Sequence, residues 1–393
     1  MASLYRREYK RKSEDAALED ASQVINDLEH WKDYIPEIID KIRSSRLELR
    51  ISALRSLNEL ISGQHIAYEE IEEYVSDLFC STKDVISEYL DISEHDEALA
   101  ALCNISLNCF SDFEGYSIVF LNDLIPLLPM VLDSERFKFY ALAFIVSFSI
   151  HSQQPCIDIM SRYIRLLVDK KARSNKFSNE TVSEIIRGLT LMISVFPESV
   201  PAVILREELK EAMDKLFESH DYEVLFCTLE LLSAVYESIN EYEPEDDEEF
   251  INVKVFSAHY KGKILDIHNS VTKKSEQKDL RNKAMSVVSL FDGENIEEEI
   301  TLIHQTKKIN GARRIIIASA IRRICKHKYQ QQMAENPGIH TTLGFDLMTK
   351  NEALRLKKRY KNEIERTRII NTREREQSIT KKREMKYNPK DED

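Results

Sequence analysis

Glycine is scarce in this sequence, with only 8 in 393 residues. Average usage is about 7%, so few positions are open to the positive-φ backbone conformations used in tight turns, strand bulges and phosphate-binding loops. Only 9 prolines occur, whereas Leu, Ile, Glu, Lys and Ala are abundant. These features argue against folds that depend on such turns and loops, and they predict an all-α chain.

Enzyme motifs are absent as well. The sequence contains no GxGxxG, GxxxxGK[ST], GxSxG or HExxH pattern. Its 10 histidines are scattered without the spacing of metal ligands. Paired carboxylates such as Glu69-Glu70 have the pattern of solvated charge on a helix. We therefore expect no catalytic residue, no metal site, no cofactor and no small-molecule substrate, and we predict that the protein is not an enzyme.

Cysteine pairs of the CxxC type are also missing. The six cysteines lie mostly in apolar runs, where we expect buried thiols of a reducing compartment rather than disulfides or zinc ligands. No secretory signal is recognised, and no uncharged run reaches the roughly 18–20 residues needed to cross a bilayer. The predicted location is cytoplasmic, with a nuclear pool as the alternative, and no membrane partner is expected.

An amphipathic helical segment recurs between residues 46 and 240. Its centre-to-centre spacings of 45, 43, 47 and 40 residues lie within the range of about 40–47 that is typical of HEAT and armadillo repeats. The centres are Leu54, Leu99, Leu142, Leu189 and Leu229. A small residue lies beside or near each centre, as close packing of inner helices requires: Ala53, Ala100, Ala141, Gly188 and Cys227. The pattern predicts a HEAT/armadillo-like α-solenoid of about five repeats.

The pattern also predicts how the whole chain is divided. The predicted parts are a basic N-terminal arm (1–15), the α-solenoid (16–240), an acidic loop (241–252), a small helical C-terminal domain (253–345) and a long basic C-terminal helix (346–393). The loop is assigned from the acidic run EYEPEDDEE at 241–249. Two helices are expected in the C-terminal domain, around Leu280–Phe291 and Arg313–Gln332, and Asn336-Pro337-Gly338 should close the second.

Charge is divided unevenly along the chain. Residues 307–390 carry 23 Lys/Arg against 8 Asp/Glu, whereas residues 1–306 carry 32 against 57, in a chain of net charge −13. Residues 349–387 hold 14 basic and 6 acidic residues, and some opposite charges lie at helical spacing, as do Arg359 and Glu363. A continuous helix there would be roughly 55 Å long. After Ile370 it has too few apolar residues to be buried in a core.

A helix with cations around its whole circumference suits a narrow anionic channel, because phosphates can be contacted on several sides at once. A solvated single helix without a ligand is the alternative, whereas a membrane-surface helix would need an apolar face. The predicted contact residues are Arg355, Lys357, Lys358, Arg359, Lys361, Arg366, Arg368, Arg373, Arg375, Lys381, Lys382, Arg383 and Lys386.

Several short motifs occur in a characteristic order. They are Ile38-Ile39-Asp40-Lys41 followed by Arg50-Ile51-Ser52-Ala53-Leu54, then Lys274-Ser-Glu-Gln-Lys-Asp-Leu-Arg281, then Gln332-Met-Ala-Glu-Asn336 leading to Leu343-Gly344, and last the Arg/Lys-rich segment 355–386. In this order the chain resembles the interferon-related developmental regulator family. It departs from the family pattern at 310–312, Asn-Gly-Ala instead of Asp-x-Trp, and at 284–286, Ala-Met-Ser instead of Phe-Arg-Asp.

The resemblance implies a dormancy (hibernation) factor that represses translation on inactive ribosomes. The family's terminal helix, here about 350–387, would thread the mRNA channel and cover the P and E tRNA sites, and the cations named above would bind rRNA. The implied partners are rRNA and ribosomal proteins between the subunits, and we expect a monomer. Because bulk rRNA should repel the acidic body, docking is expected to use the basic tail, the N-terminal arm and protein contacts.

The competing hypothesis is a nuclear armadillo-type protein-interaction scaffold or transcriptional co-regulator, a role also attached to the family. Import-receptor grooves rely on regularly placed Trp and Asn, whereas this chain has one tryptophan, Trp31, outside the repeats. This argues against an import receptor but not against scaffolding in general. Basic clusters at 357–359 and 381–383 could also serve as nuclear import signals, so the sequence leaves both hypotheses open.

Overall fold

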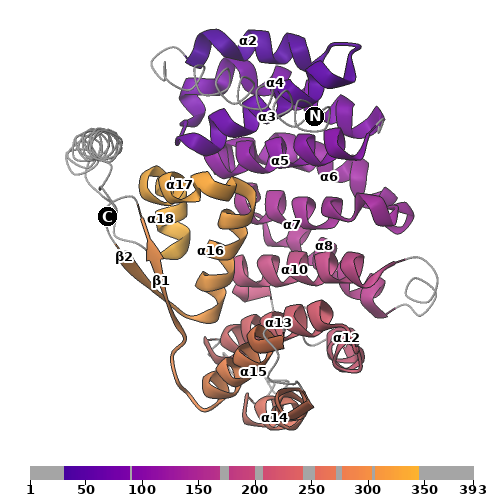
Figure 1. The fold of residues 1–393 in the computed structure, drawn as a ribbon, viewed down its shortest axis with the longest axis vertical. Helices are drawn as coiled ribbons and strands as arrows, with labels where there is room; N and C mark the ends of the chain where they lie inside the picture. The colour runs from indigo at the N-terminus through magenta and orange to yellow at the C-terminus, as the bar shows by residue number, and fades with distance from the viewer. Residues whose placement is uncertain are drawn as a thin grey trace, which may run out of the picture.

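The structure is a computed structural model that describes residues 31–88, 91–168, 177–199, 207–241, 253–270, 277–302 and 306–344. Within these ranges the chain is mostly helical, and its helices stack from α2 (Trp31–Ile42) at one end to α14 (Val253–Ser270) at the other (Figure 1). The predicted N-terminal arm (1–15), residues 242–252 of the predicted acidic loop and the predicted basic helix (346–393) lie outside the described residues.

One inner helix forms at each predicted repeat centre. These helices are α3 (Leu47–Gly63), α5 (Ile92–Cys109), α7 (Phe137–Ser149), α10 (Asn179–Val195) and α13 (Tyr222–Glu241). Each packs against the next, and the central leucine of every repeat is 0% exposed. In α7 all residues from Lys138 to Ser149 are buried, because an apolar helix must be covered on every side. The prediction of an armadillo-like helical repeat protein is confirmed.

The outer helices are buried on one face. They are α4 (Tyr68–Glu88), α6 (Glu114–Leu124), α8 (Gln153–Val168) and α12 (Glu207–Phe217), together with α2 at the end of the stack, which contains Trp31, the first described residue. In α8 the buried residues, among them Cys156, Ile159, Met160 and Tyr163, recur at helical spacing on one face. Short 3₁₀ segments connect the helices: η1 (Phe110–Phe113), η2 (Ile125–Met130), η3 (Asp133–Glu135) and η4 (Pro197–Ser199).

Gly188 shows why a repeat centre needs a small residue. A Cβ added there would lie 2.9 Å from the Cβ of Ala143 and 3.0 Å from the Cε2 of Tyr163. The Tyr163 hydroxyl in turn donates a hydrogen bond of 2.6 Å to the Phe139 carbonyl. Helices α7, α8 and α10 therefore approach too closely for a larger side chain at position 188.

A β-hairpin interrupts the helices of the C-terminal third, and here the all-α prediction is wrong. After α14 and α15 (Lys278–Phe291), which pack on each other, strand β1 (Glu297–Thr301) pairs antiparallel with β2 (Thr306–Asn310). Only Ile300 and Ile309 are buried in the two strands, each at the same place in its strand. A single hairpin of charged residues changes the overall composition little, so composition did not reveal it.

The helix predicted over Arg313–Gln332 is broken in the structure. It divides into α16 (Ala312–Cys325), η6 (Lys326–Lys328) and α17 (Tyr329–Glu335), because Lys326 takes a positive φ of 50° that ends an α-helix. Asn336 ends α17 as expected and also starts α18 (Pro337–Leu343), since its side-chain oxygen accepts from the Gly338 and Ile339 amides at 3.0 and 3.4 Å. We call residues 312–344 the C-terminal unit.

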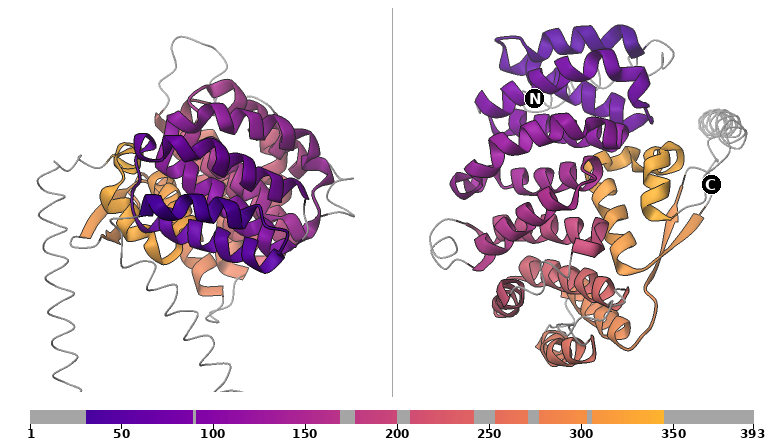
Figure 2. Two further views of the ribbon diagram at one scale, coloured as in Figure 1. Left: turned by 90° about the horizontal axis from the view of Figure 1, so that it is seen from above. Right: turned by 180° about the vertical axis from the view of Figure 1, so that it is seen from behind.

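The C-terminal unit folds back along the inner helices instead of extending the stack. Helix α16 packs against α10, α13 and α5, while α17 contacts α3 and α18 contacts α5. Figures 1 and 2 show α16–α18 lying beside the inner helices in both side-on views. The last described elements are thereby brought against the first repeats.

Candidate functional site

The predicted phosphate contacts, from Arg355 to Lys386, all lie outside the described residues, so they stay predictions. The described chain ends at Gly344, which has a φ of 68°, a conformation that glycine adopts without strain. A guanidinium nitrogen of Arg314 lies 3.1 Å from where a Cβ of residue 344 would be. Within the described residues, the candidate site is therefore the C-terminal unit and the surface it covers.

Glu237 of α13 caps the N-terminus of α16. Its carboxylate oxygens accept from the backbone N–H of Ala312 at 2.5 Å and of Arg313 at 2.9 Å. The first N–H groups of a helix have no partner within the helix and carry partial positive charge, so a carboxylate stabilises them. Gly311 has a φ of 97°, and a Cβ there would lie 3.3 Å from the Glu237 Oε1. The Asn310-Gly311-Ala312 departure from the family pattern thus falls at a helix start capped from another helix.

Glu237→Ala should lower the free energy of unfolding by about 0.5–2 kcal/mol, the usual effect of losing a helix cap. Urea denaturation followed by circular dichroism would measure this. Glu241→Ala is the matched control, because Glu241 is 61% exposed and contacts the Arg313 side chain without accepting from the α16 backbone. The control should cost less than about 1 kcal/mol, and equal effects of the two substitutions would contradict the capping role.

Arg323 ties the middle of the unit to the inner helices. Its Nη2 donates to the Glu184 carboxylate of α10 at 2.7 Å, and its guanidinium lies 4.1 Å from the centre of the Tyr140 ring on α7. Burial alone would lower the pKa of Arg323, but the hydrogen bond and charge of Glu184 raise it above the ordinary value. The ion pair is therefore charged and links three helices.

The ion pairs change the interpretation of the basic C-terminal region. Of the 23 Lys/Arg in 307–390, 8 lie in 307–344. At least four of these pair with carboxylates among the described residues: Lys308 with Glu297, Arg313 with Glu237 and Glu241, Arg322 with Glu298, and Arg323 with Glu184. Arg313 and Arg323 attach the C-terminal unit to α13 and α10, whereas Arg322 links α16 to β1 and Lys308 pairs within the hairpin. The other 15 Lys/Arg, in 345–390, lie outside the described residues.

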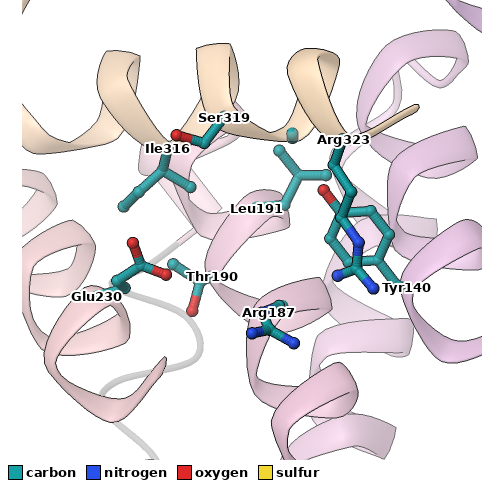
Figure 3. A pocket seen from close by; sticks show the side chains of 9 residues that line it. Tyr140, Arg187, Thr190, Leu191, Glu230, Ile316, Ser319 and Arg323 are labelled. Carbon is teal, nitrogen blue, oxygen red and sulfur yellow. The ribbon is translucent and has the colours of Figure 1, made fainter. Parts of the chain in front are cut away.

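A small pocket of about 100 Å³ lies between α16 and the inner helices (Figure 3). Its charged residues are largely paired, since Arg187 and Arg323 both contact Glu184 and Lys283 contacts Glu230. Small-molecule sites usually measure about 300–1,000 Å³, so the geometry does not favour one here. Within the described ranges, no group of three or more His, Cys, Asp or Glu could hold a metal ion, and no helix has the length and apolarity to cross a membrane.

A set of buried side-chain amides attaches α17 and the start of α18 to α3 and α5. Gln332 of α17 donates from Nε2 to the Ile61 and Gln64 carbonyls at 2.7 and 2.6 Å, and Asn336 donates from Nδ2 to the Leu107 carbonyl at 2.9 Å. Asn108 of α5 donates to the Ile61 carbonyl at 3.3 Å. Ile61 and Leu107 are in the last turns of α3 and α5, where carbonyls lack partners within the helix. We call Asn108, Gln332 and Asn336 the amide joint.

Gly338 lies directly against an aromatic ring beside the amide joint. A Cβ at this position would lie 2.2 Å from the Cε2 of Phe110, so no other residue fits without displacing the ring. Phe110 itself has a positive φ of 45°, and the neighbouring Ile339 is 0% exposed. The glycine predicted as a helix breaker is thus also needed for a close contact between distant parts of the chain.

Two histidines lie at the same interface. Burial lowers the pKa of His65, and His340 lowers it further, whereas Asn108 and the carboxylates of Glu335 and Glu70 oppose the shift. Burial also lowers the pKa of His340, against the effect of the Met333 carbonyl that its ring nitrogen meets at 2.8 Å. Both imidazoles are therefore held neutral in the folded protein at neutral pH.

Stability should fall as the pH is lowered from 7.5 to 5.5. Both folded-state pKa values lie below the ordinary value of 6.5, so the unfolded chain binds protons first and acidification favours unfolding by at most about 1.4 kcal/mol per pH unit for each imidazole. Urea midpoints measured across this range should move down with pH. The double variant His65→Gln and His340→Gln should show a flatter dependence, and an unchanged slope would contradict the assignment.

The cysteines agree with the expectation of buried thiols in five of six cases. Cys103, Cys109, Cys156, Cys227 and Cys325 are buried and Cys80 is exposed, and all six are free. Burial raises the pKa of Cys109, Cys156, Cys227 and Cys325 to about 12. These four thiols pack as small apolar side chains.

The stacked inner and outer helices define the class as an armadillo-like helical repeat protein. A family model described as "Interferon-related developmental regulator (IFRD)" matches residues 7–286, and the chain belongs to this family. Among solved structures, "Designed armadillo repeat protein YIII(Dq)4CqI" is similar, with 15% identity, a TM-score of 0.40 and coverage of 65% of this chain and 99% of that chain. No curated protein matches.

Proposed function

We propose that this protein is a ribosome-binding dormancy factor that represses translation. In this proposal the basic segment beyond Gly344 enters the mRNA channel and the P and E tRNA sites of inactive ribosomes, and the cations from Arg355 to Lys386 contact rRNA. The observation that carries the proposal is the position of the C-terminal unit. It covers the inner helices, and the basic segment continues from its last residue.

The covered inner face argues against the competing scaffold hypothesis. α-Solenoids commonly bind partners on their concave surface. Here α16–α18 lie on the inner helices, and the asparagines there are already engaged. Asn104 donates to the Asn58 side chain at 2.9 Å, and Asn108 is part of the amide joint. A peptide could bind this face only by displacing the C-terminal unit, so a scaffold would have to use other surfaces.

Sucrose-gradient sedimentation of lysates from starved and growing cells tests the proposal. Full-length protein and a variant lacking 349–393 would be followed by immunoblotting, and equal melting temperatures would show that the deletion leaves the body folded. We expect the full-length protein to migrate with monosomes but not polysomes, and the deletion variant to remain in light fractions. If both forms stay in the light fractions, the ribosome proposal is wrong and the scaffold is favoured.

A further inference from the structure

The position at which the basic segment leaves the body depends on a small number of contacts. Within the described chain, Gly344 follows α18, which packs on α16, α17 and α5. Asn336 links α18 to α5, since its side-chain oxygen caps the N-terminus of α18 while its nitrogen donates to the Leu107 carbonyl of α5. Displacing α18 from α5 would therefore move Gly344 relative to the repeats.

The amide joint requires hydrogen-bond donors on the side chains of Gln332 and Asn336. The nitrogens of Gln332 and Asn336 point at backbone carbonyl oxygens of α3 and α5, and both side chains are 0% exposed. A carboxylate has no hydrogen to donate. An oxygen in place of either nitrogen would face carbonyl oxygens in a buried setting, where an unsatisfied polar group is costly. An isosteric change can thus loosen the joint without changing side-chain size.

We propose that the amide joint is a positioning site for ribosome binding, which fixes where the basic segment leaves the body. The inference rests on the proposed function. If segment and body contact the ribosome together, a rigid connection lowers the entropy lost when the second contact forms. A loosened joint leaves the charges of the basic segment unchanged. It lowers the effective concentration of that segment at the ribosomal site that the segment is proposed to bind.

Gln332→Glu in the full-length protein is the test, with Gln330→Glu as the matched control. Both substitutions add one negative charge to α17, but within the described ranges the Gln330 amide donates one long hydrogen bond, of 3.5 Å, to the Tyr329 hydroxyl and none to a backbone carbonyl. Affinity would be measured for purified inactive ribosomes and for a single-stranded RNA homopolymer. We expect Gln332→Glu to weaken ribosome binding about tenfold or more while leaving RNA affinity within about twofold, and Gln330→Glu to resemble the unmodified protein on both ligands.

Three results would overturn the inference. They are unchanged ribosome affinity in Gln332→Glu, an equal loss of affinity for both ligands, and an equal loss in the Gln330→Glu control. If the unmodified protein does not bind ribosomes at all, the proposed function itself fails. If the unmodified protein and the Gln332→Glu variant bind ribosomes equally well, only the positioning inference fails.

A second variant keeps the test decisive if Gln332→Glu does not fold. Asn336→Asp retains the oxygen that caps α18 and removes the nitrogen that donates to the Leu107 carbonyl and to the Gln332 Oε1. Hydrogen exchange of the α18 amides should become faster in this variant while the exchange of α7 amides stays unchanged. Weaker ribosome binding together with this local change supports the positioning role, and unchanged exchange and binding contradict it.

Discussion

Arg50→Met should lower the free energy of unfolding by about 3–5 kcal/mol, because it leaves a buried carboxylate without a partner. The Arg50 and Glu94 side chains are 8% and 2% exposed. Arg50 donates from Nε and Nη2 to the Glu94 carboxylate, and from Nη1 to the Ser44 carbonyl at 3.0 Å. The pair joins α3 to α5, so its loss should unfold the first two repeats most readily. Urea denaturation would measure the change.

Two controls separate the buried pair from ordinary surface charge. Arg136→Met removes a cation of 44% exposure that pairs with Glu180 at 2.7 Å, and it should cost less than about 1 kcal/mol. The double variant Arg50→Met and Glu94→Leu should recover much of the loss, since apolar side chains of similar size can replace a buried ion pair. If Arg50→Met and Arg136→Met cost the same, the Arg50–Glu94 pair does not have the assigned role.

Raising the salt concentration from 50 to 200 mM should weaken ribosome binding about 10³–10⁵-fold if the basic segment neutralises about 6–10 phosphates. The 15 Lys/Arg in 345–390 are sufficient for that number of contacts. Each neutralised phosphate releases condensed counterions, so the logarithm of the binding constant should fall linearly with the logarithm of the salt concentration. Equilibrium binding to purified ribosomes at several salt concentrations measures the slope.

Charge reversal at Lys381, Lys382 and Arg383 provides the control for this measurement. It should reduce the magnitude of the slope by about 2–3 and weaken binding at low salt. The melting temperature of the body should not change. A salt-independent affinity of the unmodified protein would remove the electrostatic basis of the proposed function.

The repeats were predictable because their signal is local and repeated. Leu54, Leu99, Leu142, Leu189 and Leu229 lie in apolar helical runs, and all five are fully buried. Gly188 was singled out by its place beside a repeat centre, and the structure shows a clash for any larger side chain there. Helical periodicity indicates which side of a helix is buried, and each of the five repeats shows this periodicity independently.

The candidate site was only partly predictable. The Gln332–Asn336 motif was recognised, and Asn336 was correctly placed at the end of a helix. The carbonyls that these amides cap, those of Ile61, Gln64 and Leu107, lie more than 200 residues away in the sequence. Glu237 and Glu184 were not singled out, because a carboxylate on a helix has the same local pattern whether it is solvated or caps another helix.

The sequence by itself determined the helical repeats, the membership of the family and the division of charge between an acidic body and a basic C-terminal region. These properties follow from composition, from helical periodicity and repeat spacing, and from the order of motifs along the chain. Only the tertiary structure decided that α16–α18 lie on the inner helices, that Lys326 ends α16, and that Arg313 and Arg323 pair with carboxylates of α13 and α10. The physical reason is that helix ends leave backbone groups without partners within the helix, and which distant side chain satisfies them depends on packing rather than on local pattern.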